Sequence, residues 1–225
     1  MEAEEYFNRG IKHYEDGDYD GAIADYTKAI RSKPDYILAW ISRGIVLGER
    51  EEYDKAITDL DEAIRLDPND AGVWLLRGAA WNDKNEYNKA ITNYDEAIRL
   101  DPNLVDAWFN RGGAWIEKGK YDKAIADFSE AICLDPNYVD AWYNRGSAWI
   151  EKGEHDKAIS DFSEAIRLNP SDARVWNNRG IAWGVKGELD KAIADFDESV
   201  RLDPNNQNAI KCRTLVVMKK SKQKS

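Results

Sequence analysis

The sequence repeats itself every 34 residues, and this period constrains the fold more than any other feature. All six prolines lie at that spacing, from Pro34 to Pro204. A glycine series that starts at Gly10 and an Ala-Ile series that starts at Ala22 keep the same register, without an insertion or a deletion. A fixed period of this length is typical of chains that stack one small unit on the next. We expect six units, at residues 3–36, 37–70, 71–104, 105–138, 139–172 and 173–206.

Each unit is predicted to form two helices. In residues 37–70 the first stretch places Trp40, Gly44 and Leu47 on one helical stripe, because they stand at i, i+4 and i+7. The second stretch carries a broader apolar face with amphipathic spacing, which consists in that unit of Ala56, Ile57, Leu60, Ala63 and Ile64. We therefore expect an all-α chain whose repeating element is a helical hairpin.

The helix ends carry signals of their own. Between the two helices of a unit, four units have a glycine, which suits a left-handed helix end, and Glu51 and Asn85 stand there in the second and third units. The series that includes Asp54 is placed to cap the second helix, and the residue after each proline, such as Asn69, is placed to cap the next first helix. The proline itself is expected to end the second helix.

The nine tryptophans fall into two columns of this register. The first column reads Tyr6, Trp40, Trp74, Trp108, Trp142 and Trp176. The second column reads His13, Leu47, Trp81, Trp115, Trp149 and Trp183. The glycine series lies between them on the buried stripe, where a side chain would hold the paired helices apart. Since glycine inside a helix costs about 1 kcal/mol, its recurrence predicts a close contact between the two helices.

The pattern Trp-x-x-Arg-Gly-x-x-Trp, then Ala-x-x-x-Phe, then Ala and Pro, at a period of 34, resembles the tetratricopeptide repeat over residues 3–206. The resemblance implies an α-solenoid, a right-handed superhelix of helix pairs whose concave groove is lined by the first helices. It also implies a protein-binding scaffold. Residues 207–218 look like a seventh first helix, with Ile210 and Val217 at the two tryptophan columns, and we expect them to form a capping helix with one polar face. A basic tail follows at 219–225.

One position departs from the family pattern, which usually has leucine before the glycine. This chain has arginine there in every unit, at Arg9, Arg43, Arg77, Arg111, Arg145 and Arg179. A partly buried guanidinium needs a partner, and an acidic series on the second helix is in register with it, with Asn93 in place of aspartate in the third unit. We predict arginine–aspartate pairs, with each arginine stem lying against an aromatic ring.

Charge and composition narrow the class of partner. The chain has a net charge of −10, which disfavours a nucleic-acid backbone as the main partner. The two cysteines form no disulfide framework, and we expect a reducing, cytoplasmic location. The acidic start lacks the features of a signal peptide, and no apolar run is long enough for a membrane span, so no membrane partner is expected.

No motif for catalysis is found. The glycines are repeat positions and do not form a phosphate-binding loop, and the chain has neither a Cys-x-x-Cys nor a His-Glu-x-x-His pattern. The two histidines, His13 and His155, replace aromatic residues in repeat columns, which favours a packing role. We expect a protein without enzymatic activity, cofactor or metal.

The first helices carry a second stripe that their own hairpin does not use. Following it from unit to unit predicts a peptide-binding wall with three kinds of side chain. The apolar and aromatic members are Phe7, Ile41, Leu75, Leu76, Phe109 and Tyr143. The asparagines, which can pair with the backbone of an extended peptide, are Asn8, Asn110, Asn144 and Asn178. The acids at the end of the first helices are Glu49, Asp83, Glu117 and Glu151.

These features predict a non-enzymatic scaffold that holds a peptide segment, extended or helical, of another protein. We expect that peptide to bury apolar side chains toward units two and three and to carry basic flanks. Two alternatives stay open at this stage: a structural module that binds a second copy of itself, and a fragment of a larger regulator or enzyme.

Overall fold

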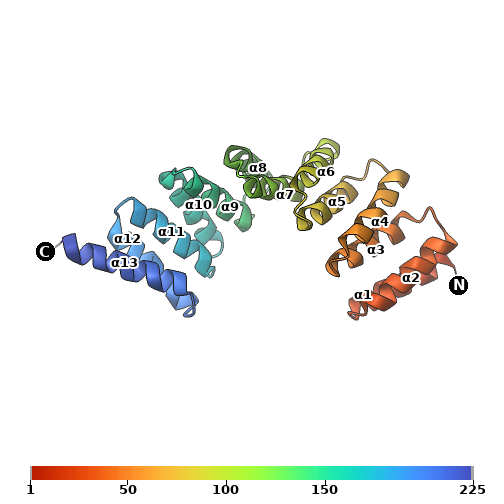
Figure 1. The fold of residues 1–225 in the computed structure, drawn as a ribbon, viewed down its shortest axis with the longest axis horizontal. Coiled ribbons are helices and arrows are strands. Elements are labelled where there is room, and N and C mark those ends of the chain that lie inside the picture. The colour runs from red at the N-terminus through yellow and green to blue at the C-terminus, as the bar shows by residue number, and fades with distance from the viewer. Residues whose placement is uncertain (1, 224–225) are drawn as a thin grey trace. The chain divides into compact units, whose positions relative to one another are not determined.

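The computed structural model describes residues 2–223, which form thirteen α-helices and no strand (Figure 1). The helices are α1 (Ala3–Glu15), α2 (Tyr19–Ser32), α3 (Ile37–Glu49), α4 (Tyr53–Leu66), α5 (Ala71–Asp83), α6 (Tyr87–Leu100), α7 (Val105–Glu117), α8 (Tyr121–Leu134), α9 (Val139–Glu151), α10 (His155–Leu168), α11 (Ala173–Val185), α12 (Leu189–Leu202) and α13 (Gln207–Gln223). The all-α solenoid of short hairpins predicted from the period is confirmed.

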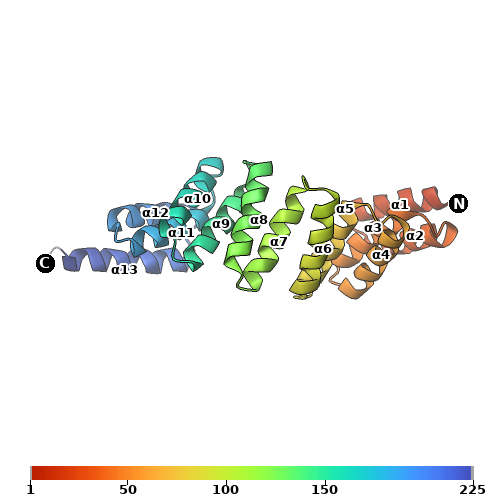
Figure 2. The same cartoon turned by 90° about the horizontal axis from the view of Figure 1, so that it is seen from above.

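The helices group into two compact parts, one up to Ala114 and one from Trp115 on. In the first, hereafter the N-terminal part, α1 packs on α2, α3 on α4 and α5 on α6, and each hairpin also packs on the next (Figure 2). In the second, the C-terminal part, α9 packs on α10, α11 on α12, and α13 on α12. Neighbouring first helices touch as well, α3 with α5 and α9 with α11.

The core of each hairpin is built by the second helix. One large ring or branched side chain is fully enclosed there, and small alanines on either side let the neighbouring helices approach. The enclosed rings are Tyr26, Tyr94, Phe128, Phe162 and Phe196.

The glycine series faces these enclosed rings, as the sequence predicts. A Cβ atom built on Gly78 would lie 2.5 Å from Cε1 of Tyr94, and one built on Gly146 would lie 2.7 Å from Cε1 of Phe162. Cβ atoms do not approach other non-bonded atoms this closely, so the absence of a side chain is what lets the two helices pack together.

The turns confirm one prediction and correct another. Glu51 and Asn85 adopt a φ of 60°, the left-handed conformation that glycine takes in the other turns. The capping positions were wrong by one or two residues, because each helix begins elsewhere than expected. Asp54 lies in the first turn of α4, where its negative charge interacts favourably with the positive end of the helix dipole. Asn69 does not cap α5; Asp70 does, through its side chain.

Helix α13 continues the array as a seventh first helix. It extends to Gln223, so residues 219–223, assigned above to a basic tail, are helical; residues 224–225 lie outside the described range. Ala209 is buried against α12, whereas Leu215, Val217 and Met218 are 57, 41 and 56% exposed. The outer face of this helix is therefore partly apolar and not the polar face expected of a cap, because no further helix covers it within the described residues.

The predicted arginine–aspartate pairs are present in both parts. Arg43 donates to both carboxylate oxygens of Asp59 in its own hairpin, at 2.7 Å each, and to Thr27 Oγ1 of the preceding hairpin at 2.8 Å. Arg145 and Arg179 repeat this with Asp161 and Asp195, again with a serine of the preceding hairpin. Each guanidinium also lies over the tryptophan of its own helix, 5.1 Å from the ring centre for Arg43. The sixteen-residue spacing in both directions thus joins two hairpins at Arg43, Arg145 and Arg179, whereas Arg9 lies in the first hairpin and pairs with Asp25 there.

Arg77 and Arg213 have their ion-pair partner sixteen residues earlier, on the preceding second helix. Arg77 meets Asn93 at 2.7 Å in its own hairpin, and its ion-pair partner is Asp61 of the preceding hairpin. Arg213, on α13, pairs with Asp197 of α12 at the same sixteen-residue spacing and so extends the series beyond the sixth unit.

A second ladder joins the hairpins on their exposed side. Here a basic residue at the end of a first helix pairs with an aspartate thirty residues earlier, on the second helix of the preceding hairpin. The pairs are Arg50–Asp20, Lys84–Asp54, Lys152–Asp122, Lys186–Asp156 and Lys220–Asp190. We refer to these contacts as the lysine series.

The Asp25–Arg9 pair makes stability depend on acid. The Arg9 guanidinium, which hydrogen-bonds Asp25, and Lys28 nearby hold the pKa of this buried carboxyl well below its usual range, against the opposing effect of burial. A lowered pKa in the folded state contributes stability above the unfolded value of about 4, and this contribution is lost as the pH falls below it. At neutral pH we expect Asp25→Asn to unfold at a lower urea concentration than the wild type, because its free energy of unfolding is lower by about 2 kcal/mol. Urea titrations between pH 7 and pH 2 should show that difference shrink; a constant difference would contradict the pairing.

Candidate functional site

The predicted wall is formed by first helices that touch one another within each part. In the N-terminal part, Ile41 on α3 and Leu75 and Leu76 on α5 are half-buried, and Asn8 on α1 is exposed. The carboxylates of Glu49 and Asp83, at the ends of α3 and α5, are exposed. Half-buried apolar residues beside exposed acids are what a peptide-binding surface needs.

Phe7 does not belong to this surface. Its ring is 8% exposed and lies 5.0 Å from the ring of Tyr36 and 5.6 Å from that of Tyr26, centre to centre. Tyr36, which precedes α3, covers the side of Phe7 that the stripe predicted to be open. Phe7 is therefore a core residue, and we leave it out of the proposed surface.

The acids of the N-terminal part border a cavity of about 250 Å³ between α3, α4 and α5. Its apolar lining comes from Ile45, Leu60 and Leu76, and its acidic lining from Glu49 and Asp83. Although Asp83 is exposed, the loss of water on the side of its carboxyl group that faces the protein raises the pKa of Asp83 above its usual range, with a smaller opposing effect from a hydrogen bond to Asn82. The arrangement places negative charge at the rim of an apolar hollow.

Tyr14 on α1 is a member of this surface that the predicted set omits. Its hydroxyl donates a 2.6 Å hydrogen bond to Glu49, and that bond raises the pKa of Tyr14 to about 12. The contact fixes the position of the Glu49 carboxylate between two neighbouring hairpins. Tyr14 stands seven residues after Phe7 on the same stripe, which is the signal that could have included it.

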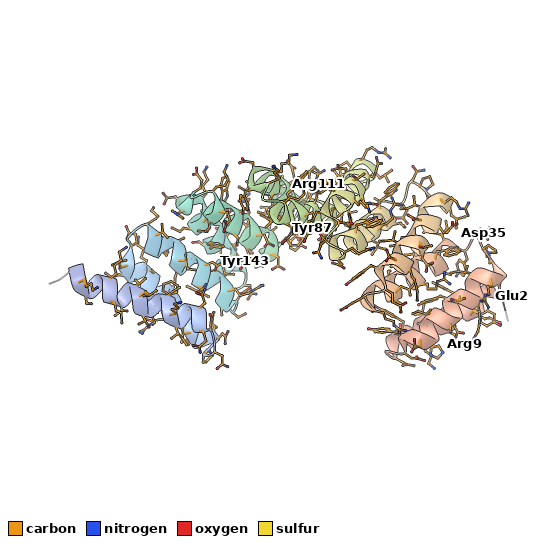
Figure 3. All side chains as sticks on the ribbon, in the orientation of Figure 1. Glu2, Arg9, Asp35, Tyr87, Arg111 and Tyr143 are labelled. Atoms are coloured by element: carbon orange, nitrogen blue, oxygen red, sulfur yellow. The ribbon has the colours of Figure 1, made fainter. Side chains whose placement is uncertain are left out.

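In the C-terminal part the surface is more polar and is already cross-linked. The side-chain amide of Asn178 donates to the hydroxyl of Tyr143 at 3.1 Å, and its oxygen accepts from the amide of Asn177 at 3.1 Å. Tyr143 is labelled in Figure 3. Asn177 is buried, and its own oxygen has no hydrogen-bond partner among the described residues. Asn178 is therefore held in place, with part of its hydrogen-bonding capacity in use.

A second cavity, of about 190 Å³, lies beside this cluster. It is lined by Ser147, Ile150, Glu151, Asn178 and Ile181, so an asparagine and an acid of the predicted set meet there. Arg174 was not predicted; its guanidinium lies 5.1 Å from the ring centre of Tyr143 and so covers one face of that ring.

The other predicted residues lie on α7 and α9. Phe109 and Asn110 are half-buried on the part of α7 that belongs to the N-terminal part, and Glu117 is exposed at the start of the C-terminal part. Asn144 is half-buried on α9. A continuous row of Asn110, Asn144 and Asn178 thus remains a prediction.

Other kinds of site were sought across residues 2–223. No cluster of three or more histidine, cysteine or acidic side chains in these residues is arranged to hold a metal ion. No helix in the same range combines the length and the apolar character that crossing a bilayer requires.

The comparisons with known proteins agree with the fold. Family models described as tetratricopeptide repeats match residues 7–71, 139–172 and 173–206, and one described as a TPR repeat matches residues 82–115 and 114–149. Together these matches cover most of the chain. Among curated proteins, none matches the sequence.

Solved structures of repeat proteins are similar to this chain along most of its length. YrrB, described as a TPR protein with an unusual peptide-binding site, has a TM-score of 0.72 at 22% identity, over 84% of this chain and 97% of its own. MamA has a TM-score of 0.69 at 28% identity, over 73% and 96%. PilF of Pseudomonas aeruginosa has a TM-score of 0.79 at 18% identity, over 94% and 96%. At these identities the likeness concerns the fold.

Proposed function

Because the chain belongs to the tetratricopeptide repeat family, a fold of protein-interaction scaffolds, we propose that it is a non-enzymatic scaffold that binds a peptide segment of another protein along its first helices. The observation that carries the proposal is the cavity between α3 and α5, which combines an apolar lining with the Glu49 and Asp83 carboxylates. Such a site suits an apolar side chain followed by lysine or arginine.

The polar cluster of the C-terminal part supports a different kind of contact. Asn144 has no protein hydrogen bond to its side chain among the described residues, and Asn178 keeps one amide hydrogen and one oxygen lone pair for a ligand. Groups of this kind recognise a peptide backbone. We propose that this part holds the main chain, while the N-terminal part selects apolar and basic side chains.

The test is a selection of binding peptides from a random library displayed on phage. The affinity of one selected peptide, carrying a fluorescent label, is then measured by titration with the protein. We expect the selected peptides to place lysine or arginine next to apolar residues. The double variant Glu49→Gln, Asp83→Asn should weaken binding about tenfold and reduce its dependence on salt, because it removes the two carboxylates at the cavity. Selected peptides without basic residues would contradict the proposal.

The matched control removes two carboxylates elsewhere. Glu62 and Glu96 lie on the second helices α4 and α6, where they pair with Arg65 and Arg99 of the same helices. The variant Glu62→Gln, Glu96→Gln changes the net charge by the same amount and should bind as the wild type does. An equal loss in both variants would show that net charge, and not the cavity, determines affinity.

The alternative of a self-assembling module depends on α13, because its Leu215, Val217 and Met218 side chains are exposed. Light scattering across a range of concentrations separates the two functions. A molecular mass that stays constant across concentrations supports the scaffold. A mass that rises with concentration in the wild type but stays constant in Val217→Lys would favour self-assembly.

A further inference from the structure

The second tryptophan column has a defined environment of two cations. In the third unit the ring centre of Trp81 lies 4.1 Å from Lys89 Nζ and 5.4 Å from Lys84 Nζ. The same two contacts are present at 4.4 and 5.6 Å for Trp149, and at 4.4 and 5.9 Å for Trp183. An aromatic ring between two ammonium groups is attracted by both through its π face.

The second unit keeps the cations and lacks the ring. Arg50 and Lys55 stand where Lys84 and Lys89 stand in the third unit, but the tryptophan position holds Leu47. A cavity of about 560 Å³ opens at this place, lined by Leu47, Arg50 and Lys55 together with Ile23 and Thr27 of α2 and Thr58 of α4. Its size is that of a small-ligand site.

The charges around the cavity select the kind of ligand. Three basic side chains, Arg43, Arg50 and Lys55, and three acidic ones, Asp20, Glu52 and Asp59, line it, so the lining carries no net charge. An anion would gain nothing overall from such a lining, and neither would a cation. A neutral ring gains the apolar contact with Leu47 and Ile23 and the cation–π contacts.

The ion pairs at the mouth of the cavity need not break when a ring enters. Arg50 pairs with Asp20, and Lys55 pairs with Glu52. In the third unit Lys84 likewise pairs with Asp54 while it contacts Trp81. An ion pair and a cation–π contact are therefore compatible on one cation, as Lys84 shows.

We propose that this cavity binds a neutral aromatic ring of indole size supplied by another molecule, in the position that tryptophan occupies in the four units from the third to the sixth. The ring can belong to a tryptophan of a partner chain or to a free indole compound, since both offer the same π face. The cavity shares no residue with the peptide surface on the first helices, so this inference does not depend on the proposed function.

The test measures binding of N-acetyltryptophanamide and of indole by saturation-transfer NMR and calorimetry, with N-acetylleucinamide as the aliphatic control. We expect the wild type to bind both aromatic probes at one site and not to bind the control. Tighter binding of N-acetyltryptophanamide assigns the ring to a peptide chain; equal or tighter binding of indole assigns it to a free compound. Failure of both probes to bind would overturn the proposal.

Two variants locate the site. Leu47→Trp fills the cavity with the residue that the third to sixth units have at this position. It should raise the dissociation constant of both probes at least tenfold and also raise the melting temperature. Lys55→Gln leaves the cavity open, removes one cation and should weaken binding about threefold to tenfold. Unchanged affinity in both variants would refute the assignment, and the second variant keeps the test valid if the first does not fold.

Discussion

Asp161→Asn is expected to lower the free energy of unfolding by about 2–3 kcal/mol, since removing one partner of a buried ion pair leaves the other charge without compensation. Arg145 donates to both oxygens of Asp161 at 2.8 Å, and its side chain is only 17% exposed. The asparagine can keep one hydrogen bond but no charge. Urea unfolding followed by circular dichroism measures the loss, and hydrogen exchange should place it in the hairpins joined by Arg145.

A second substitution should restore most of that stability. In the third unit the chain itself has asparagine at this position, and Arg77 takes its ion-pair partner, Asp61, from the preceding hairpin. Ser129 is the equivalent of Asp61 for Arg145, at 3.0 Å from the guanidinium. The double variant Asp161→Asn, Ser129→Asp copies the arrangement of Arg77. If it is no more stable than Asp161→Asn alone, the charge of the partner does not matter at this site.

Gly78→Ala should be the second strongly destabilising change, by about 1–3 kcal/mol, as is typical of overpacked cores. The new Cβ atom would lie 2.5 and 2.7 Å from two carbons of the Tyr94 ring, which is 1% exposed and has no space to move into. The gain in helix propensity, about 1 kcal/mol, offsets part of this cost. The melting temperature and the near-ultraviolet circular dichroism of the aromatic residues report the change.

Gly44→Ala is the matched control at the same repeat position. Its nearest side-chain neighbour would be Cγ of Leu60 at 3.2 Å, and a leucine can shift where a packed ring cannot. We expect this variant to be within about 0.5 kcal/mol of the wild type or slightly more stable. Equal destabilisation by both alanines would show that backbone effects, and not the ring, explain the glycine series.

Repetition explains how much of the fold could be predicted from the sequence. The spacing of apolar residues in one short segment can fit more than one structure, but the same spacing in six units indicates one structure for all of them. The hairpins, the glycine contact and the arginine–aspartate pairs were therefore predicted correctly. The capping residues were not, because cap geometry depends on where a helix begins to within one residue. Asp54 stands two places after the residue that precedes α4, and Asn69 stands one place before the residue that precedes α5.

The candidate site was harder to predict, because a column treats all units as equivalent and ignores the loop that precedes the next helix. Phe7 is covered by Tyr36, the last residue of the first unit, whereas the last residue of the second unit is Asp70. The cavity at Leu47 shows the same limit. The sequence reveals that tryptophan is missing, but only the packing of α2 and α4 shows that no neighbour fills its place.

The two ladders that join the hairpins differ in how far water reaches them. The arginines between Arg43 and Arg179 are largely enclosed, whereas the aspartates of the lysine series are about 80% exposed, at Asp54 for example. Exposed pairs are screened by dissolved ions and enclosed pairs much less. Where both ladders join two neighbouring hairpins, added salt is therefore expected to weaken the exposed ion pair and to leave the contacts of the enclosed arginine largely intact.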